Sequence, residues 1–141
     1  MLAKHPEVQQ KAYEEVMSLN KSEFTFEDAK QLKYLDAIVH ETLRLYPPAV
    51  LSSKVCCEDD HLPDGTFVSA GTEVTWSMWY MGRNNKALWG EDVRVFRPER
   101  WLEMEKRPSA FDFPVFQAGP RICLGMNMSL LESKIFTATM L

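Results

Sequence analysis

Apolar side chains recur every three to four residues in three stretches of the chain, which is the spacing of one face of a helix. This periodicity predicts helices over residues 1–19, 26–46 and 125–141. The second helix begins after a capping-box sequence at Thr25. It ends at Pro47-Pro48, because neither proline offers a backbone N–H and the second disfavours a helical conformation at the first.

Between residues 50 and 75 the pattern changes from helical spacing to short extended stretches. Turn-forming residues at 62–65 and at Ala70-Gly71 separate these stretches, so short antiparallel strands are expected. Residues 76–80 are apolar, and periodicity does not choose between strand and helix for them. The predicted fold class is mainly α with short antiparallel β (α+β).

Residues 84–117 have no periodicity and contain glycine and proline at close intervals. A stretch this long without regular structure is uncommon inside a compact domain. Its aromatic side chains argue against disorder, and they include Trp89, Phe96, Trp101 and Phe111. Other parts of the chain must therefore hold this stretch in place.

Composition narrows the classes of function. The 141 residues include 16 Lys and Arg against 20 Asp and Glu, which gives a formal net charge of −4, and no block of like charge stands out. Nucleic acid is therefore not expected as a partner. No apolar run approaches the about 20 residues that span a bilayer. The cysteines are Cys56, Cys57 and Cys123, an odd count that favours a reducing compartment over a disulfide framework.

The candidate chemistry is concentrated in residues 116–125, FQAGPRICLG. Cys123 stands just before a predicted helix N-terminus, where free N–H groups and the helix dipole stabilise a thiolate. Gly119 permits a tight turn, and Gly125 permits close approach of a bulky group. Arg121 offers a planar fork for a carboxylate. Together they suit a large anionic cofactor bound through its metal, and the simpler alternative is a buried cysteine in a turn.

The pattern F-x-x-G-x-R-x-C-x-G of residues 116–125 resembles the haem-binding signature of the cytochromes P450, which are haem-thiolate monooxygenases. The resemblance implies that Cys123 ligates the iron of haem b (iron protoporphyrin IX). The cofactor-binding residues implied by the resemblance are Cys123, Arg121, Phe116, Gly119, Gly125 and Lys54. Lys54 is expected to face a haem propionate, and the alternative is an ordinary exposed lysine in a strand.

Two further segments resemble motifs of the same family. Residues 41–44, Glu41-Thr-Leu-Arg44, resemble its Glu-x-x-Arg motif. Residues 98–101 resemble its Pro-Glu-Arg-Phe motif, with Trp in the last position. The resemblance implies a buried structural network of Glu41, Arg44 and Arg100 that holds residues 84–117. The alternative is a solvated surface pair, which contributes little to stability.

The resemblance covers essentially the whole chain, and residues 1–141 are expected to form a single partial cytochrome P450 domain. We expect the C-terminal part of that fold, without the oxygen-activating helix and the N-terminal membrane anchor. The implied reaction inserts one atom of O₂ into an apolar C–H bond, with electrons from NADPH–cytochrome P450 reductase. The motifs are most similar to those of eukaryotic fatty-acid ω-hydroxylases, so the expected substrate is a fatty acid or a similar apolar lipid.

The resemblance also places a substrate-lining stretch after Pro47-Pro48. Its residues are Ala49, Val50, Leu51, Ser52 and Ser53, for which plain core or turn is the alternative. No side chain is expected to act as a catalytic acid or base. The full-length protein is expected at the endoplasmic reticulum membrane, on its cytosolic face. The alternative to an enzyme is a non-catalytic truncated product or pseudogene fragment without a complete haem pocket.

Overall fold

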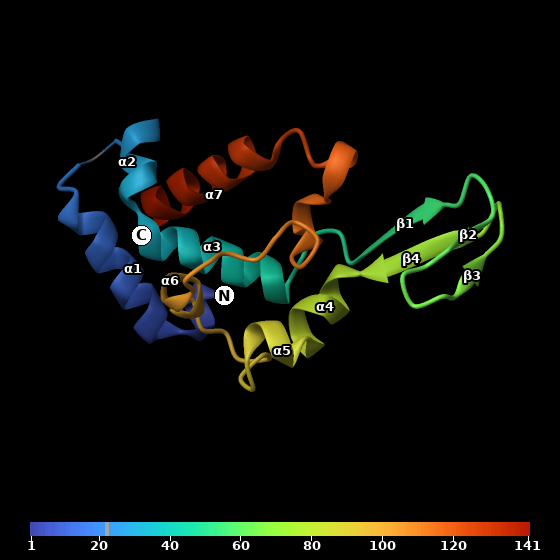
Figure 1. Ribbon diagram of the computed structural model, residues 1–141. Coiled ribbons are helices and arrows are strands. Elements are labelled where there is room, and N and C mark those ends of the chain that lie inside the picture. The colour runs from blue at the N-terminus through green and yellow to red at the C-terminus, as the bar shows by residue number, and fades with distance from the viewer. Residues whose placement is uncertain (22) are drawn as a thin grey trace.

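Helix α3 lies at the centre of the protein, and the other helices are arranged around it (Figure 1). The computed structural model describes residues 1–21 and 23–141. The helices of the described residues are α1 (Pro6–Ser18), α2 (Phe26–Gln31), α3 (Lys33–Leu45), α4 (Met78–Asn84), α5 (Lys86–Trp89), α6 (Arg100–Glu103) and α7 (Met126–Met140). Short 3-10 helices are η1 (Leu2–Lys4), η2 (Pro114–Phe116) and η3 (Gly119–Arg121). The strands are β1 (Leu51–Val55), β2 (Asp60–His61), β3 (Phe67–Val68) and β4 (Glu73–Ser77). The predicted α+β class is confirmed.

The main hydrophobic core lies where α1, α3 and α7 meet. Helix α3 contacts α1 on one side and α7 on the other, and it also contacts α4 and α6. Most of the buried side chains of this core come from α1, α3 and α7, and the full set is Val8, Ala12, Val16, Leu32, Leu35, Ile38, Leu45, Phe96 and Ala138. The amphipathic faces predicted for the first two helical stretches are therefore faces that α1 and α3 bury, whereas the buried residue of α7 is Ala138, outside the predicted apolar face.

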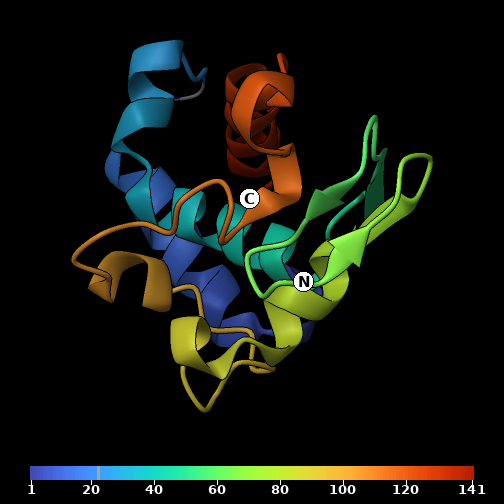
Figure 2. The same ribbon diagram turned by 45° about the vertical axis from the view of Figure 1, so that its right-hand side comes forward.

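The strands form an arm that projects from the helices (Figures 1 and 2). Strands β1 and β4 pair antiparallel, with Leu51 opposite Ser77, and β2 pairs antiparallel with β3. Both predicted turns are present, and each uses a glycine in the left-handed region, Gly65 at φ 86° and Gly71 at φ 82°. The arm is therefore a ribbon of paired strands built on locally encoded turns.

The ambiguous residues 76–80 contain a boundary between two kinds of structure. Strand β4 ends at Ser77 and α4 begins at Met78. The hydroxyl of Ser77 accepts a hydrogen bond from the backbone N–H of Tyr80 at 3.1 Å. This N-cap starts the helix directly at the end of the strand. Residues 76–80 therefore belong partly to a strand and partly to a helix, and neither periodicity describes all of them.

The prediction of one continuous helix over residues 26–46 is wrong, because the helix breaks at Leu32. The capping box at its start is confirmed, since the Thr25 hydroxyl accepts the backbone N–H of Asp28 and the Asp28 carboxylate accepts that of Thr25. After the break, the N–H groups of Tyr34 and Leu35 donate to the carboxylate of Glu15, at 2.7 and 2.9 Å. A side chain of α1 thus caps the new N-terminus of α3.

Candidate functional site

A single buried carboxylate, that of Glu41 in α3, organises the part of the protein without regular structure. Glu41 is 0% exposed. Arg44 donates to it through Nε and Nη2, at 2.8 Å each. Arg100 Nε donates at 3.0 Å and Trp101 Nε1 at 2.9 Å. The backbone N–H of Arg97 adds a fifth hydrogen bond at 2.9 Å. The start of α6 is therefore attached to the middle of α3.

The far end of the Arg44 guanidinium binds one backbone carbonyl in the last turn of α4 and two in the irregular stretch. Its Nη1 donates to the carbonyl oxygen of Gly82 and, at 2.5 Å, to that of Val93. Its Nη2 donates to the carbonyl oxygen of Val95 at 3.2 Å. Carbonyls in the last turn of a helix and in irregular backbone lack regular hydrogen-bond partners, so a fully buried arginine takes that place.

Arg100 acts in the same way on the neighbouring turn. Its Nη1 donates to the carbonyl oxygen of Trp89 and, at 3.1 Å, to the carboxylate of Asp92. Its Nη2 donates to the backbone carbonyl of Asp92 at 3.1 Å. Glu41, Arg44 and Arg100 are thus brought together and buried, and the alternative of a solvated surface pair is wrong.

The charges of this network are mutually compensating. Burial raises the pKa of Glu41, but the hydrogen bonds and charge of Arg44, the Arg97 N–H and the charge of Arg100 outweigh it and lower that pKa overall. Glu41 is therefore ionised at neutral pH. Two buried guanidiniums face the carboxylates of Glu41 and Asp92, and no buried charge in this group is left without an opposite one.

Two further residues of the network were not identified from the sequence. Trp101 is one, because the sequence shows it only as a tryptophan in the last position of the Pro-Glu-Arg-Phe motif. The other is Gly82 in α4, where a Cβ atom would overlap the backbone carbonyl oxygen of Arg44. Only glycine lets α4 approach α3 closely enough for Arg44 to bind the Gly82 carbonyl. A lone glycine in a short helix gave no signal of this contact.

The segment that carries Cys123 folds as a loop closed by one backbone hydrogen bond. The N–H of Cys123 donates to the carbonyl oxygen of Phe116 at 2.7 Å. Gly119 lies in the left-handed region at φ 67°, as the predicted tight turn requires. Gly125 is the N-cap of α7, and the backbone N–H of Met126 donates to the Cys123 carbonyl at 3.3 Å. Cys123 therefore lies two residues before the N-cap of α7, just before the helix N-terminus, as predicted.

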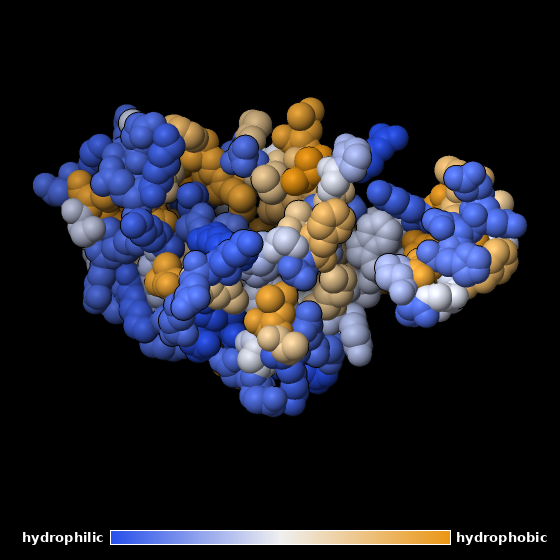
Figure 3. All heavy atoms as spheres, viewed as in Figure 1, coloured by the Kyte–Doolittle hydropathy of each residue, from blue (hydrophilic) through white to orange (hydrophobic). Residues whose placement is uncertain are grey.

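The thiol of Cys123 is exposed, so the alternative of a buried cysteine in a turn is wrong. Its neighbours Ile122 and Leu124 are 45% and 103% exposed. A Cβ on Gly125 would lie 4.0 Å from the Cys123 sulfur, so glycine keeps that side of the thiol open. Figure 3 shows hydrophobic side chains gathered at the top of the view, where this loop and α7 lie.

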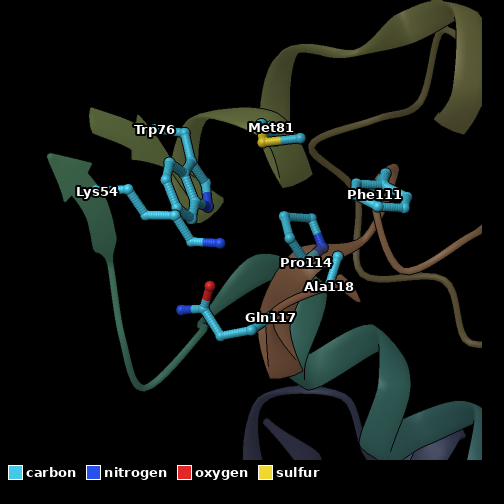
Figure 4. Close-up of a pocket in the computed structure, with 7 residues that line it drawn as sticks. All are labelled: Lys54, Trp76, Met81, Phe111, Pro114, Gln117 and Ala118. Carbon is cyan, nitrogen blue, oxygen red and sulfur yellow. The ribbon is translucent and has the colours of Figure 1, made fainter. Parts of the chain in front are cut away.

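A pocket of about 310 Å³ adjoins this loop (Figure 4). Its lining residues come from the strand arm, from α4 and from residues 111–118, and they are Lys54, Trp76, Met81, Phe111, Pro114, Gln117 and Ala118. The amino group of Lys54 and the side-chain amide of Gln117 point toward one another across it. Gln117 Nε2 also donates to the hydroxyl of Ser52 at 2.8 Å. The structure thus brings Lys54 to the cysteine loop, from more than sixty residues earlier.

The remaining candidates lie at the edge of this region. Phe116 is half-buried, and Arg121 is exposed, with no hydrogen-bond partner for its side chain among the described residues. In the stretch after Pro47-Pro48, Ala49, Val50 and Leu51 are exposed, as is Ser53, whereas Ser52 is half-buried. The alternative of plain core is therefore wrong for these four exposed positions.

A large, flat, anionic cofactor with a central metal fits these residues. The donor set comprises one accessible thiol on a loop fixed by its own backbone. Exposed apolar side chains flank the thiol, and Lys54 and Arg121 supply cations for acidic groups at the cofactor edge. Haem has these properties. In the part of the chain that is described, no helix has the length and apolar character to span a bilayer.

Comparison with known proteins gives a consistent result. Residues 1–141 match the cytochrome P450 family. The chain is 46% identical to cytochrome P450 CYP94D108 of Paris polyphylla over 82% of its own length and 24% of that protein. It is 41% identical to cytochrome P450 94A1 of Vicia sativa, over 98% of its own length and 28% of that protein. A cytochrome P450 of Helianthus annuus is 48% identical over 74% of this chain and 68% of that protein.

Proposed function

Because this chain belongs to the cytochrome P450 family, whose members are haem monooxygenases, we propose that it provides the cysteine-ligand side of a haem-thiolate monooxygenase. The chain spans 24–29% of the length of the Paris polyphylla and Vicia sativa relatives. The activity proposed therefore belongs to the longer protein of which such a chain is a part. The observation that carries the proposal is the exposed Cys123 thiol on a loop closed by its own backbone N–H.

Each residue of the loop has a defined part in this proposal. Cys123 binds the iron through its sulfur, and the hydrogen bond from its N–H to Phe116 fixes the direction of the thiol. Gly125 leaves room for the haem macrocycle beside the sulfur. Gly119 makes the tight turn that reverses the chain within the loop. The backbone N–H of Met126, at the start of α7, donates to the Cys123 carbonyl and fixes the other end of the loop.

The cations hold the acidic edge of the cofactor. Lys54 lies in the pocket beside the loop and binds a haem propionate, and Arg121 binds the other from the exposed side of the loop. When bound, haem b supplies the activation of O₂, and its thiolate ligand favours cleavage of the O–O bond. The protein's contribution is the ligand, the propionate contacts and a fixed loop. Glu41, Arg44 and Arg100 hold the backbone from Gly82 to Trp101 in place and take no part in the reaction.

The substrate proposed is a fatty acid or a similar apolar lipid, oxidised at a C–H bond. Support comes from the motifs of the sequence, which are most similar to those of fatty-acid ω-hydroxylases. The stretch from Ala49 to Ser53, exposed except at the half-buried Ser52, lies next to the pocket of Lys54 and lines the substrate region in this proposal. Electrons come from NADPH–cytochrome P450 reductase, and the full-length protein is placed at the cytosolic face of the endoplasmic reticulum membrane.

The test uses the full-length protein and three versions of it: unchanged, Cys123→Ser and Cys57→Ser. Cys57 is a matched control, because it is also an exposed free cysteine but lies in the strand arm. The reduced carbon monoxide complex of the unchanged protein and of Cys57→Ser should show the Soret band typical of thiolate ligation. Cys123→Ser should lose it. A thiolate-type band that survives in Cys123→Ser would refute the assignment of the iron ligand.

A further inference from the structure

A second pocket, away from the Cys123 loop, is lined mainly by cations. Its volume is about 350 Å³, and it is lined by Lys30, Lys33, Asp36, Leu102, Arg107 and Lys134. These residues come from α2, α3, α6, the chain after α6, and α7. The chain as a whole carries a net charge of −4, so four cations around one pocket do not follow from its composition.

Asp36 holds two of these cations in position. Its carboxylate accepts a hydrogen bond from Arg107 Nη2 at 2.7 Å and lies 3.3 Å from Lys134 Nζ. Lys134 is only 14% exposed, and Arg107 is restrained further because its guanidinium lies over the ring of Trp101. His40 packs beside Asp36 and adds no negative charge. One carboxylate therefore orients two cations without neutralising both.

The other two cations are less compensated. Lys30 pairs with Glu27 at 2.8 Å, on the exposed surface of α2. No carboxylate of the described residues lies within 4.0 Å of the Lys33 ammonium. Four cations thus face two carboxylates, and an excess of two positive charges is left at one concave site. Like charges that line one pocket repel one another, and a bound anion offsets that repulsion.

We propose that this pocket binds a phosphate group, carried by inorganic phosphate or by a phosphomonoester. A phosphomonoester at neutral pH has a charge close to −2, which matches the excess of two positive charges, and its oxygens are strong hydrogen-bond acceptors. The volume falls within the about 300–1,000 Å³ typical of small-molecule sites. A guanidinium and three ammonium groups are the side chains that bind phosphate best.

The neighbouring surface distinguishes the two sources of the phosphate group. A hollow of about 260 Å³ shares Lys30, Asp36 and Lys134 with the pocket. Its other walls are largely apolar and include Phe26, Leu130 and Leu131. This hollow could receive the organic part of a phosphomonoester, so a phenyl phosphate should bind more tightly than inorganic phosphate if that source is the physiological one.

The experiment titrates the 141-residue chain with inorganic phosphate, and separately with phenyl phosphate, in an isothermal calorimeter at low salt. The variants are Lys33→Gln and Lys134→Gln. Lys86→Gln is the matched control, because Lys86 is an exposed lysine that pairs with Glu91 on α5, outside the pocket. We expect saturable binding by the unchanged chain and by Lys86→Gln, and about tenfold weaker binding by each pocket variant, as loss of one charged hydrogen bond predicts.

Far-UV circular dichroism separates loss of a ligand group from loss of the fold. Lys33 is exposed, so Lys33→Gln should keep the circular dichroism spectrum of the unchanged chain. If Lys134→Gln unfolds, the phosphate affinity of Lys33→Gln still decides the test. The proposal is overturned if neither phosphate binds saturably, or if Lys33→Gln binds as the unchanged chain does. It is also overturned if Lys86→Gln weakens binding equally. Binding of a polyglutamate peptide but of neither phosphate would instead mark the pocket as a docking surface for an acidic protein.

Discussion

Replacing Glu41 by Gln should destabilise the protein more than any conservative change at its surface. The carboxylate of Glu41 accepts hydrogen bonds at both oxygens, from Arg44 and Arg97 among others. A glutamine keeps the shape but has one oxygen and one NH₂ group. Whichever way its amide turns, the NH₂ faces N–H donors, since Arg44 donates to both oxygens, Arg100 to one and Trp101 to the other.

The magnitude follows from what remains buried. In the Glu41→Gln variant, Arg44 at 0% and Arg100 at 3% exposure keep their charges without the central carboxylate. Removing one partner of a buried ion pair typically costs about 3–5 kcal/mol. That is a large part of the about 5–15 kcal/mol by which domains are stable. We therefore expect Glu41→Gln to lower the free energy of unfolding by about 3–5 kcal/mol.

The assay is urea unfolding at pH 7, followed by tryptophan fluorescence, to which Trp89 and Trp101 contribute from positions buried against Phe113. The matched control is Glu103→Gln, because Glu103 is a 59% exposed carboxylate that pairs with Arg97 at the surface. That pair should contribute no more than about 1 kcal/mol. If Glu41→Gln and Glu103→Gln shift the unfolding midpoint equally, the network does not carry the stability assigned to it.

Three further predictions follow from features described above. Gly82→Ala should lower the urea midpoint more than Gly71→Ala. The first forces a Cβ onto a backbone carbonyl oxygen, whereas a Cβ at Gly71 meets nothing within 4 Å and costs only the roughly 1–2 kcal/mol of a left-handed backbone at φ 82°. Equal shifts would contradict the close approach. Hydrogen bonds from Lys21 and Thr25 lower the pKa of Asp28 to about 2, so its contribution to stability is present above pH 4 and is lost as pH falls toward 2. An acid titration of Asp28→Asn should lack that step. Expressed alone with haem, a reductase and NADPH, the 141-residue chain should form no hydroxylated fatty acid above a Cys123→Ser control, because one face of the haem stays open to water; mass spectrometry of the products tests this.

The sequence predicted those features whose causes lie within a few residues. The capping box at Thr25, the turns at Gly65 and Gly71 and the position of Cys123 before a helix all have local causes. The break at Leu32 does not, because the carboxylate that caps α3 belongs to Glu15, 19 residues before the N–H that it binds. No local pattern could show that this carboxylate would be there.

The network shows the same division between local and distant causes. Glu41 and Arg44 lie one helical turn apart, so their pairing is readable from spacing. Arg100 was connected to them only through the family resemblance. The indole of Trp101 and the backbone N–H of Arg97 were not predicted, because a hydrogen bond to a backbone group or a ring nitrogen leaves no periodic signature. The roles of Cys123, Lys54 and Arg121 toward haem stay predictions.

The separation between Glu41 and its partners also sets an order of events during synthesis. The donors from Arg97, Arg100 and Trp101 lie 56, 59 and 60 residues further along the chain. At a translation rate of about 5–20 residues per second, Glu41 leaves the ribosome roughly 3–12 seconds before they do. During that interval its carboxylate has only Arg44 and water as partners. Desolvation of the carboxylate must therefore be one of the last steps of folding, and a ribosome that stalls before residue 101 leaves a nascent chain whose central helix cannot bury its charge.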